Sequence, residues 1–225
     1  MNIVLVISPH PDDETLGCGG TLIRHKQEGD EIHWLIMTCV NSSEKKMHSV
    51  KEKEIGEVSK AFNFNSTSRT KFTTSQLDSV PRKEIIQVIS KVFQEIQPNF
   101  LYLPFQNDIH SDHSIVFDAA ASCTKSFRYP YIKRVMIYET ISETEFSIRP
   151  DKEQFKPNLW IDISDYIELG EGYYNVEIIY TENFDYEIFG PEHWSSVDIE
   201  YISPLELGGY LGDIRVIRDN SQDEN

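Results

Sequence analysis

The amino-terminal segment most constrains what this chain can fold into. An apolar run rich in β-branched residues, Ile3–Ser8, leads directly into His10-Pro11-Asp12-Asp13-Glu14. Such a run is typical of a strand buried on both faces of a parallel sheet. Ligands of open α/β sheets bind at the carboxyl ends of the strands. We therefore expect one imidazole and two adjacent carboxylates, those of Asp12 and Asp13, at a ligand-binding edge.

The remaining sequence alternates between strand-like and helix-like segments. This pattern predicts an α/β fold, a Rossmann-like three-layer sandwich with a mostly parallel sheet and a loop-rich C-terminal lobe. The length of 225 residues suits one domain over 1–218, with a core at 1–139, a lobe at 140–218 and a flexible tail at 219–225. Strands are expected at Ile3–Ser8, Glu31–Thr38, Lys71–Thr73, Phe100–Leu103, Arg134–Tyr138, Trp160–Ile161 and Ile214–Ile217, and helices at Thr15–Glu28, His48–Phe62, Pro81–Gln97, Ser114–Ser126 and Ser164–Ile178.

Two polar clusters in this pattern have the composition of a metal site. His10 and Asp13 are three residues apart, so a tight turn can direct both at one ion. A second cluster, 107–113, contains His110 and His113 and also follows a strand-like run. Taken singly, the carboxylates could cap a helix and the histidines could be solvated loop residues. Two such clusters at the same edge of one sheet favour a metal.

The segments Ser8–Glu14 and His110–His113 resemble the two motifs of the PIG-L/LmbE family of zinc-dependent N-deacetylases. The resemblance covers 2–219, is specific in the two motifs and is loose elsewhere. It implies that His10, Asp13 and His113 bind Zn²⁺, that Asp12 is the general base, that His110 stabilises the oxyanion and protonates the leaving amine, and that Asp112 positions a catalytic histidine. Two histidines and one carboxylate also suit Fe²⁺, so iron is an alternative in the cell.

These residues support metal-assisted hydrolysis of an amide. Zinc lowers the pKa of water towards about 7 and polarises a carbonyl, and Asp12 would accept the proton of the attacking water. A protonated His110, with its imidazolium favoured by Asp112, would hold the oxyanion. The expected substrate is a small-molecule conjugate of N-acetylglucosamine, and the expected location is the cytoplasm.

The resemblance also implies substrate contacts at Lys51, Glu139 and His193. Lys51 stands where the family has an arginine, and lysine cannot make the planar bidentate contact. One sugar-deacetylase branch of the family carries a lysine near Gly170 and an arginine near Gly208-Gly209, and neither is present here. Lys51 could instead belong to a solvated helix face with glutamate partners, and His193 could pack in a loop.

Charge and composition restrict the partners. The formal net charge of −16 argues against nucleic acid and anionic membranes. No apolar run approaches the ~18 residues of a membrane span, and no signal peptide precedes the first strand. Three cysteines without a C-x-x-C pair indicate no disulfide framework, and a homo-oligomer stays open.

Three alternatives remain at this point. A nucleotide-binding module is suggested by Gly17-Cys18-Gly19-Gly20 after a strand, but the spacing fails the dinucleotide fingerprint. The others are a metal-binding protein without catalysis and a deacetylase acting on the sugar precursor of a thiol cofactor.

Overall fold

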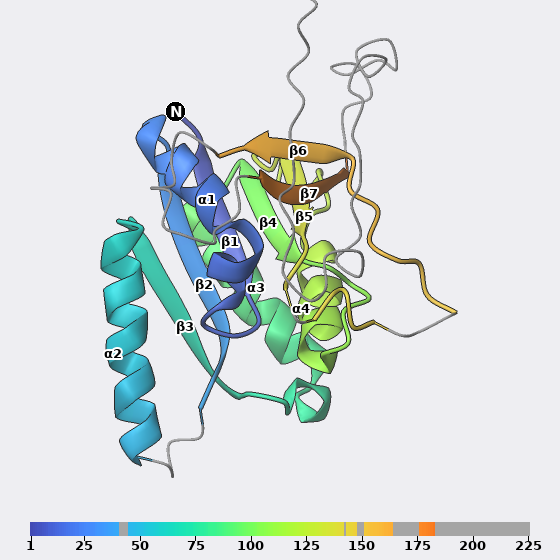
Figure 1. Ribbon diagram of the computed structural model, residues 1–225. Coiled ribbons are helices and arrows are strands. Elements are labelled where there is room, and N and C mark those ends of the chain that lie inside the picture. The colour runs from blue at the N-terminus through green and yellow to red at the C-terminus, as the bar shows by residue number, and fades with distance from the viewer. Residues whose placement is uncertain (41–44, 142, 148–150, 164–175, 183–225) are drawn as a thin grey trace, which may run out of the picture.

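The computed structural model describes residues 1–40, 45–141, 143–147, 151–163 and 176–182 (Figure 1). Seven strands and four α-helices make up this part of the chain. The strands are β1 (Ile3–Ser8), β2 (Glu31–Cys39), β3 (Ser66–Thr73), β4 (Phe100–Pro104), β5 (Arg134–Tyr138), β6 (Leu159–Asp162) and β7 (Val176–Glu182); the helices are α1 (Asp13–Gln27), α2 (Lys45–Ala61), α3 (Arg82–Ile96) and α4 (Ser111–Ala121), with a 3-10 turn, η1, at Leu77–Ser79.

All seven strands belong to one sheet with the order β3-β2-β1-β4-β5-β7-β6. Strands β1 to β5 are parallel, whereas β7 is antiparallel to β5 and β6 is antiparallel to β7. From β1 the chain proceeds outward to β3 on one side, then returns to β4 and proceeds outward on the other side. The neighbours β1 and β4 therefore flank a topological switch point, where doubly wound sheets bind ligands beyond their carboxyl ends.

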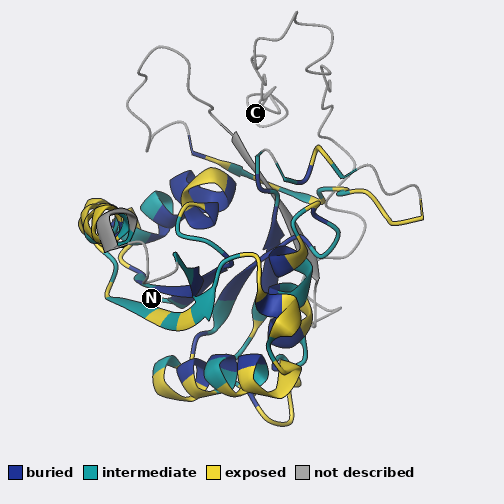
Figure 2. Cartoon of the chain, turned by 90° about the horizontal axis from the view of Figure 1, so that it is seen from below, coloured by how far each residue is buried: buried dark blue, intermediate teal, exposed yellow. Residues whose placement is uncertain are grey.

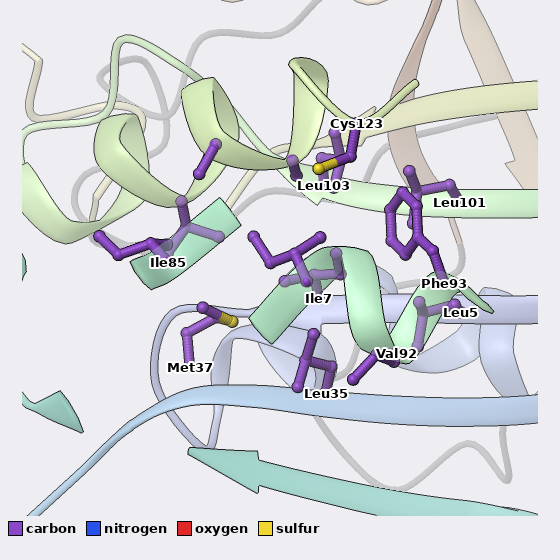
Figure 3. Close-up of a cluster of buried hydrophobic side chains, with 14 of the residues drawn as sticks. Leu5, Ile7, Leu35, Met37, Ile85, Val92, Phe93, Leu101, Leu103 and Cys123 are labelled. Carbon is purple, nitrogen blue, oxygen red and sulfur yellow. The ribbon is translucent and has the colours of Figure 1, made fainter. Parts of the chain in front are cut away.

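Helices cover both faces of the sheet and enclose two cores (Figures 1 and 2). Alternate residues of β1 point to opposite faces, so Leu5 and Ile7 belong to one core and Val4 and Val6 to the other. The core under α3 and α4 joins Leu5 and Ile7 to side chains of β2, β4 and both helices (Figure 3). Strand β1 is thus buried on both faces, as its apolar run predicts.

The predicted fold class, an α/β sandwich with a mostly parallel sheet, is confirmed, and β1 and β5 have the predicted bounds. Helix α4 begins at Ser111 and not at Ser114, so the second motif lies in its first turn. Strand β3 has eight residues where three were predicted, since it is an edge strand without a fully buried residue and lacks a clear apolar pattern.

The predictions for the chain after β5 are partly wrong and partly outside the described residues. A helix extending to Ile178 is wrong for its last three residues, because β7 begins at Val176 and pairs with both β5 and β6. The rest of that helix, the strand at Ile214–Ile217, the remaining lobe and the tail lie outside the described residues.

None of the helices in the described part of the chain combines the length and the apolar character needed to cross a membrane.

Candidate active site

Side chains of β2 hold the end of β1 in place where the first motif begins. The indole Nε1 of Trp34 donates to Ser8 Oγ over 2.9 Å. The hydroxyl of Thr38 donates to the carbonyl oxygen of Pro9 over 2.8 Å. Both contacts are buried, so the turn after β1 leaves the sheet from a fixed position.

The carboxylates of the first motif do not act as helix caps. Asp12 occupies the N-cap position of α1, yet its side chain makes no capping hydrogen bond within the described chain. Asp13 instead accepts the backbone N–H of His10 at Oδ2 over 2.7 Å. This bond closes the turn and directs the Asp13 carboxylate at the imidazole ring of His10.

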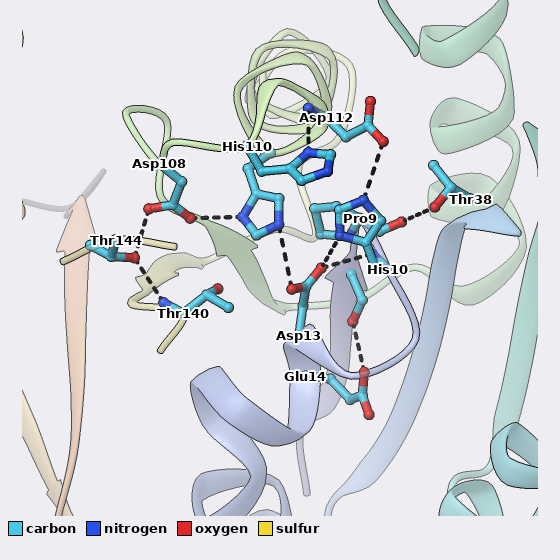
Figure 4. A network of polar contacts seen from close by, with 12 residues as sticks. Pro9, His10, Asp13, Glu14, Thr38, Asp108, His110, Asp112, Thr140 and Thr144 are labelled. Atoms are coloured by element: carbon cyan, nitrogen blue, oxygen red, sulfur yellow. Dashed lines mark hydrogen bonds and ion pairs between the residues drawn. The ribbon is translucent and has the colours of Figure 1, made fainter. Parts of the chain in front are cut away.

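Asp13 lies between two histidine rings that come from the two motifs (Figure 4). Its Oδ2 is 3.4 Å from His10 Nδ1, and its Oδ1 is 3.4 Å from His113 Nε2. The Nε2 atom of His113 is buried and has no hydrogen-bond partner in the described chain. A buried nitrogen left in this way is costly unless a ligand occupies the space it faces. Two imidazoles and one carboxylate thus form a donor set that fits a metal ion.

Each of these two rings is bound on its other side by a second carboxylate. His113 Nδ1 is 2.7 Å from Asp108 Oδ2, and His10 Nε2 is 3.2 Å from Asp112 Oδ2. Carboxylates in this position fix the orientation and the tautomer of histidine ligands. As a result, His10 Nδ1 and His113 Nε2 both face Asp13.

A second set, His10, His110 and Asp112, also has its ligand atoms within 4.8 Å of one another. However, Asp112 Oδ2 already accepts the backbone N–H of Ser75 over 2.7 Å, and Oδ1 accepts that of Leu77 over 3.3 Å. With the His10 contact, both oxygens of Asp112 are engaged. Asp112 is therefore placed to orient a histidine, and the set around Asp13 is the better metal site.

The protonation of these groups follows from their contacts with one another, which outweigh the effect of burial. Burial lowers the pKa of His10, but hydrogen bonds to Asp112 and Asp13 outweigh it and raise this pKa to about 9. Burial also lowers the pKa of His113, and Asp108 and Asp13 raise it to about 10. Burial alone would raise the pKa of Asp13, yet its two histidine partners hold it well below the usual range. A metal ion would replace the ring protons that face Asp13.

His110 is the N-cap residue of α4, and its ring lies next to His10, with 4.4 Å between the ring centroids. Its Nδ1 accepts the backbone N–H of Asp112 over 3.1 Å, so the proton of the neutral ring is on Nε2, 3.3 Å from Ser75 Oγ. Burial and the neighbouring His10 lower the pKa of His110. The structure therefore presents a neutral donor, whereas the expectation was an imidazolium held by the Asp112 carboxylate, which instead contacts His10.

Asp12 is exposed beside the His10–Asp13–His113 cluster. Partial enclosure and the charge of Asp13 raise the pKa of its carboxyl group, while the positive charges of His10 and Lys51 lower it. The Lys51 side chain lies on α2, with Nζ 3.0 Å from Glu54 Oε2, as the solvated-helix interpretation expects. It still acts electrostatically on Asp12, which keeps a substrate role open.

Glu139 follows directly after β5, and its carboxyl group is half-buried. Burial, and then the charges of Glu145 and Asp108, raise its pKa to about 7. His193 lies outside the described residues, so its predicted substrate contact is not placed.

Sequence reasoning gave no role to three residues of this site, Asp108, Ser75 and Thr144. Asp108 stands five positions before His113 in the second cluster, and that spacing could have suggested an orienting carboxylate. Ser75 has no motif around it. It adopts a left-handed backbone with φ of 59° and contacts both Asp112 and His110 from the segment between β3 and η1.

Comparison with known proteins extends this picture. The probable N-acetyl-alpha-D-glucosaminyl L-malate deacetylase 2 of Bacillus anthracis is 20% identical over 175 residues, covering 73% of this chain and 75% of that protein. The conserved protein TT1542 of Thermus thermophilus has a similar structure, with a TM-score of 0.57, 26% identity and coverage of 74% of each chain. GalB, the 4-carboxy-2-hydroxymuconate hydratase of Pseudomonas putida, also shares the fold, with a TM-score of 0.56, 17% identity and coverage of 73% of this chain and 74% of that one.

The family described as PIG-L, GlcNAc-PI de-N-acetylase, matches residues 5–124, which is more than half of the chain. The matched region includes most of β1, all of β4 and the polar segments that follow these strands, and hence both sequence motifs, but it ends before Glu139. The chain belongs to the PIG-L family.

Proposed function

We propose that this protein is a metal-dependent hydrolase that removes the acetyl group from an N-acetylated amino sugar, with a conjugate of N-acetylglucosamine as its substrate. The observation that carries the proposal is the pair of histidine nitrogens directed at one buried carboxylate, Asp13, with an exposed second carboxylate, Asp12, beside them. The membership of the PIG-L family supports deacetylation.

The fold by itself does not select this reaction, because it is also used by a hydratase. The family description and the malate-deacetylase relative favour hydrolysis of an acetamide over hydration. Deacetylation of a thiol-cofactor sugar precursor and metal binding without catalysis are the alternatives that an experiment has to separate.

His10, Asp13 and His113 would hold the metal ion, either Zn²⁺ or Fe²⁺. When bound, the ion would supply Lewis acidity, which polarises the acetyl carbonyl and makes water a stronger nucleophile. Asp108 and Asp112 would keep the two rings oriented, since each accepts a hydrogen bond from the ring nitrogen that faces away from Asp13.

Asp12 would act as the general base. Its carboxylate is adjacent to Asp13 in the chain, is exposed, and makes no capping bond to α1, so it is available to a water molecule near the cluster. It would accept the proton of the water that attacks the acetyl carbon.

His110 would stabilise the oxyanion that forms in this attack. Within the described residues, its Nε2–H contacts Ser75 Oγ at 3.3 Å, a long hydrogen bond that a substrate oxygen can replace while the Nδ1 contact to Asp112 keeps the ring in place. A fixed donor of this kind strengthens as negative charge develops on the oxygen. The proton that Asp12 accepts from the water would go to the departing sugar amine, because the neutral His110 ring could transfer its Nε2 proton only by becoming an imidazolate.

The test is acetate release from N-acetylglucosamine and a panel of its conjugates by the metal-reconstituted protein. Asp12→Asn should lower kcat by at least about 100-fold and leave the metal content unchanged. Asp118→Asn is the matched control, because Asp118 is exposed on α4 in an ion pair with Arg82. Bound metal without acetate release from any conjugate would overturn the proposal and favour a silent metal-binding protein.

A further inference from the structure

We propose that Asp108 and Thr144 form a positioning pair that sets the tautomer of His113 and thereby the metal affinity of the site. The inference rests on the metal cluster of the proposed function. It assigns a role to two residues that lie outside both sequence motifs, one in the loop after β4 and one in the segment after β5.

The three side chains form a buried chain of hydrogen bonds (Figure 4). Thr144 Oγ1 is 2.6 Å from Asp108 Oδ1, and Asp108 Oδ2 is 2.7 Å from His113 Nδ1. Asp108 is 1% exposed, His113 is 0% exposed and Thr144 is 8% exposed, so water does not compete for these bonds. Thr144 Oγ1 also lies 2.9 Å from the backbone nitrogen of Thr140.

The direction of each bond follows from the donor at the end of the chain. The backbone N–H of Thr140 can only donate, so Thr144 Oγ1 accepts there and has its single proton left for Asp108. The carboxylate of Asp108 accepts that proton at Oδ1 and can only accept again at Oδ2. In the neutral ring, the form that binds a metal, His113 must therefore carry its proton on Nδ1, which leaves the lone pair of Nε2 directed at Asp13 and the metal position.

Two further contacts join the same two segments without touching Asp108. The backbone N–H of Ile109 donates to the carbonyl oxygen of Glu143 over 3.2 Å. Ser147 Oγ donates to the carbonyl oxygen of Asn107 over 2.6 Å. Ser147→Ala thus weakens the junction between the segments as Thr144→Val does, but it leaves the Asp108 carboxylate fully bonded, which makes it the matched control.

Substitution of Asp108 or Thr144 should weaken metal binding and not only destabilise the fold. In Asp108→Asn, the amide can present its NH₂ group to His113 Nδ1 and favour the tautomer whose Nε2 carries the proton. Loss of an orienting partner of a histidine ligand typically costs about 10- to 100-fold in metal affinity. We expect that range for Asp108→Asn, about 10-fold for Thr144→Val, and little change for Thr144→Ser, which keeps the hydroxyl.

The experiment measures the dissociation constants of Zn²⁺ and Co²⁺ on the full chain by competition with a chromophoric chelator. The visible absorption of the Co²⁺ form and the Tm of the metal-free form are recorded for each variant. The proposal expects weaker binding and an altered Co²⁺ spectrum in Asp108→Asn and Thr144→Val, with Thr144→Ser and Ser147→Ala close to wild type. Metal constants and spectra that stay at wild-type values while Tm falls would overturn it, because the pair would then be structural only.

These outcomes separate the inference from the proposed function. If the wild-type chain binds metal tightly and releases no acetate, the deacetylase proposal fails while the effect of Asp108 is still measured. If the wild-type chain binds neither ion, the metal site fails and the positioning role fails with it.

Discussion

The carboxyl group of Glu139 lowers the stability of the fold when it ionises, although it is also proposed to contact the substrate. Its half-buried carboxyl group has a pKa of about 7 in the folded protein, against 4.5 for an ordinary glutamate. Burial is the largest cause, and the charges of Glu145 and Asp108 add to it. The folded chain therefore holds this proton more tightly than the unfolded chain does.

This difference predicts that Glu139→Gln stabilises the protein in a pH-dependent way. Below about pH 4.5 the carboxyl group is protonated in both the folded and the unfolded chain, so it does not lower the free energy of unfolding. Between about pH 4.5 and 7 it ionises freely only in the unfolded chain, so the free energy of unfolding falls as the pH rises. The neutral amide avoids this cost. We expect a gain in the free energy of unfolding of about 1 to 2 kcal/mol at pH 8, after allowing for solvent screening, and almost none at pH 4.

Urea denaturation of both proteins at the two pH values checks this prediction. An equal gain at pH 4 and pH 8 would mean that ionisation is not the cause. If Glu139 also contacts the substrate, the stabilised variant should have a raised KM, as is common when a strained polar group serves function.

At the same scale, the sequence predicts some site residues far better than others. The structure brings His10, Asp13 and His113 together, and they could be proposed from spacing and from two strand ends that share one edge. Their metal-binding role stays a prediction. Ser75 and Thr144 reach the site from segments without a motif, and only the folded chain places them there.

Helix α1 approaches the sheet at backbone distance because Gly17 faces β5. An ideal Cβ on Gly17 would lie 2.3 Å from Cδ2 of Tyr138 and 2.9 Å from the carbonyl oxygen of Glu139. Tyr138 cannot yield easily, since its ring is 0% exposed and its hydroxyl donates to the carbonyl oxygen of Ile7 over 2.9 Å. A side chain at position 17 therefore has to displace the helix.

Gly17→Ala should consequently lower the free energy of unfolding by about 1 to 3 kcal/mol through overpacking. Gly56→Ala on α2 is the matched control, because no atom of another part of the described chain lies within 4 Å of its added Cβ. There the greater helix propensity of alanine should raise stability by up to about 1 kcal/mol. Denaturation curves of both variants measure whether the free energy of unfolding falls or rises. A Gly17→Ala variant as stable as the wild type would contradict the close packing of α1 on β5.

The sequence predicts best the elements that consist mainly of buried apolar residues inside the sheet. Strands β1 and β5 are apolar and central, and their bounds agree with the prediction. The start of α4 was missed because its first turn consists of the polar residues Ser111, Asp112 and His113, which look like loop residues until two of them are seen to be buried. Strand β7 was missed because its antiparallel pairing with β5 and β6 depends on contacts distant in the sequence.

At the scale of the whole molecule, charge bears on which sugar conjugates the site accepts. The chain has a formal net charge of −16. Around the His10–Asp13–His113 cluster, Asp12 is exposed and Glu139 and Glu143 are partly buried. Burial raises the pKa of Glu143, the positive charge of His113 lowers it, and the charges of Asp13 and Asp108 raise it again. The excess of carboxylates on the chain as a whole repels anionic ligands and leaves neutral ones unaffected.

We therefore expect a lower KM for neutral N-acetylglucosamine than for its 1-phosphate. Raising the salt concentration should lower the KM of the phosphate ester several-fold and leave that of the neutral sugar nearly constant, because salt screens the repulsion. Glu143→Gln should reduce the difference in KM between N-acetylglucosamine and its 1-phosphate. Glu95→Gln is the control, because it removes one negative charge from α3, where Glu95 is exposed and pairs with Lys91. It should leave the difference in KM unchanged. A phosphate ester that binds more tightly than the neutral sugar at low salt would contradict this expectation, because a local cation such as Lys51 would then outweigh the net charge.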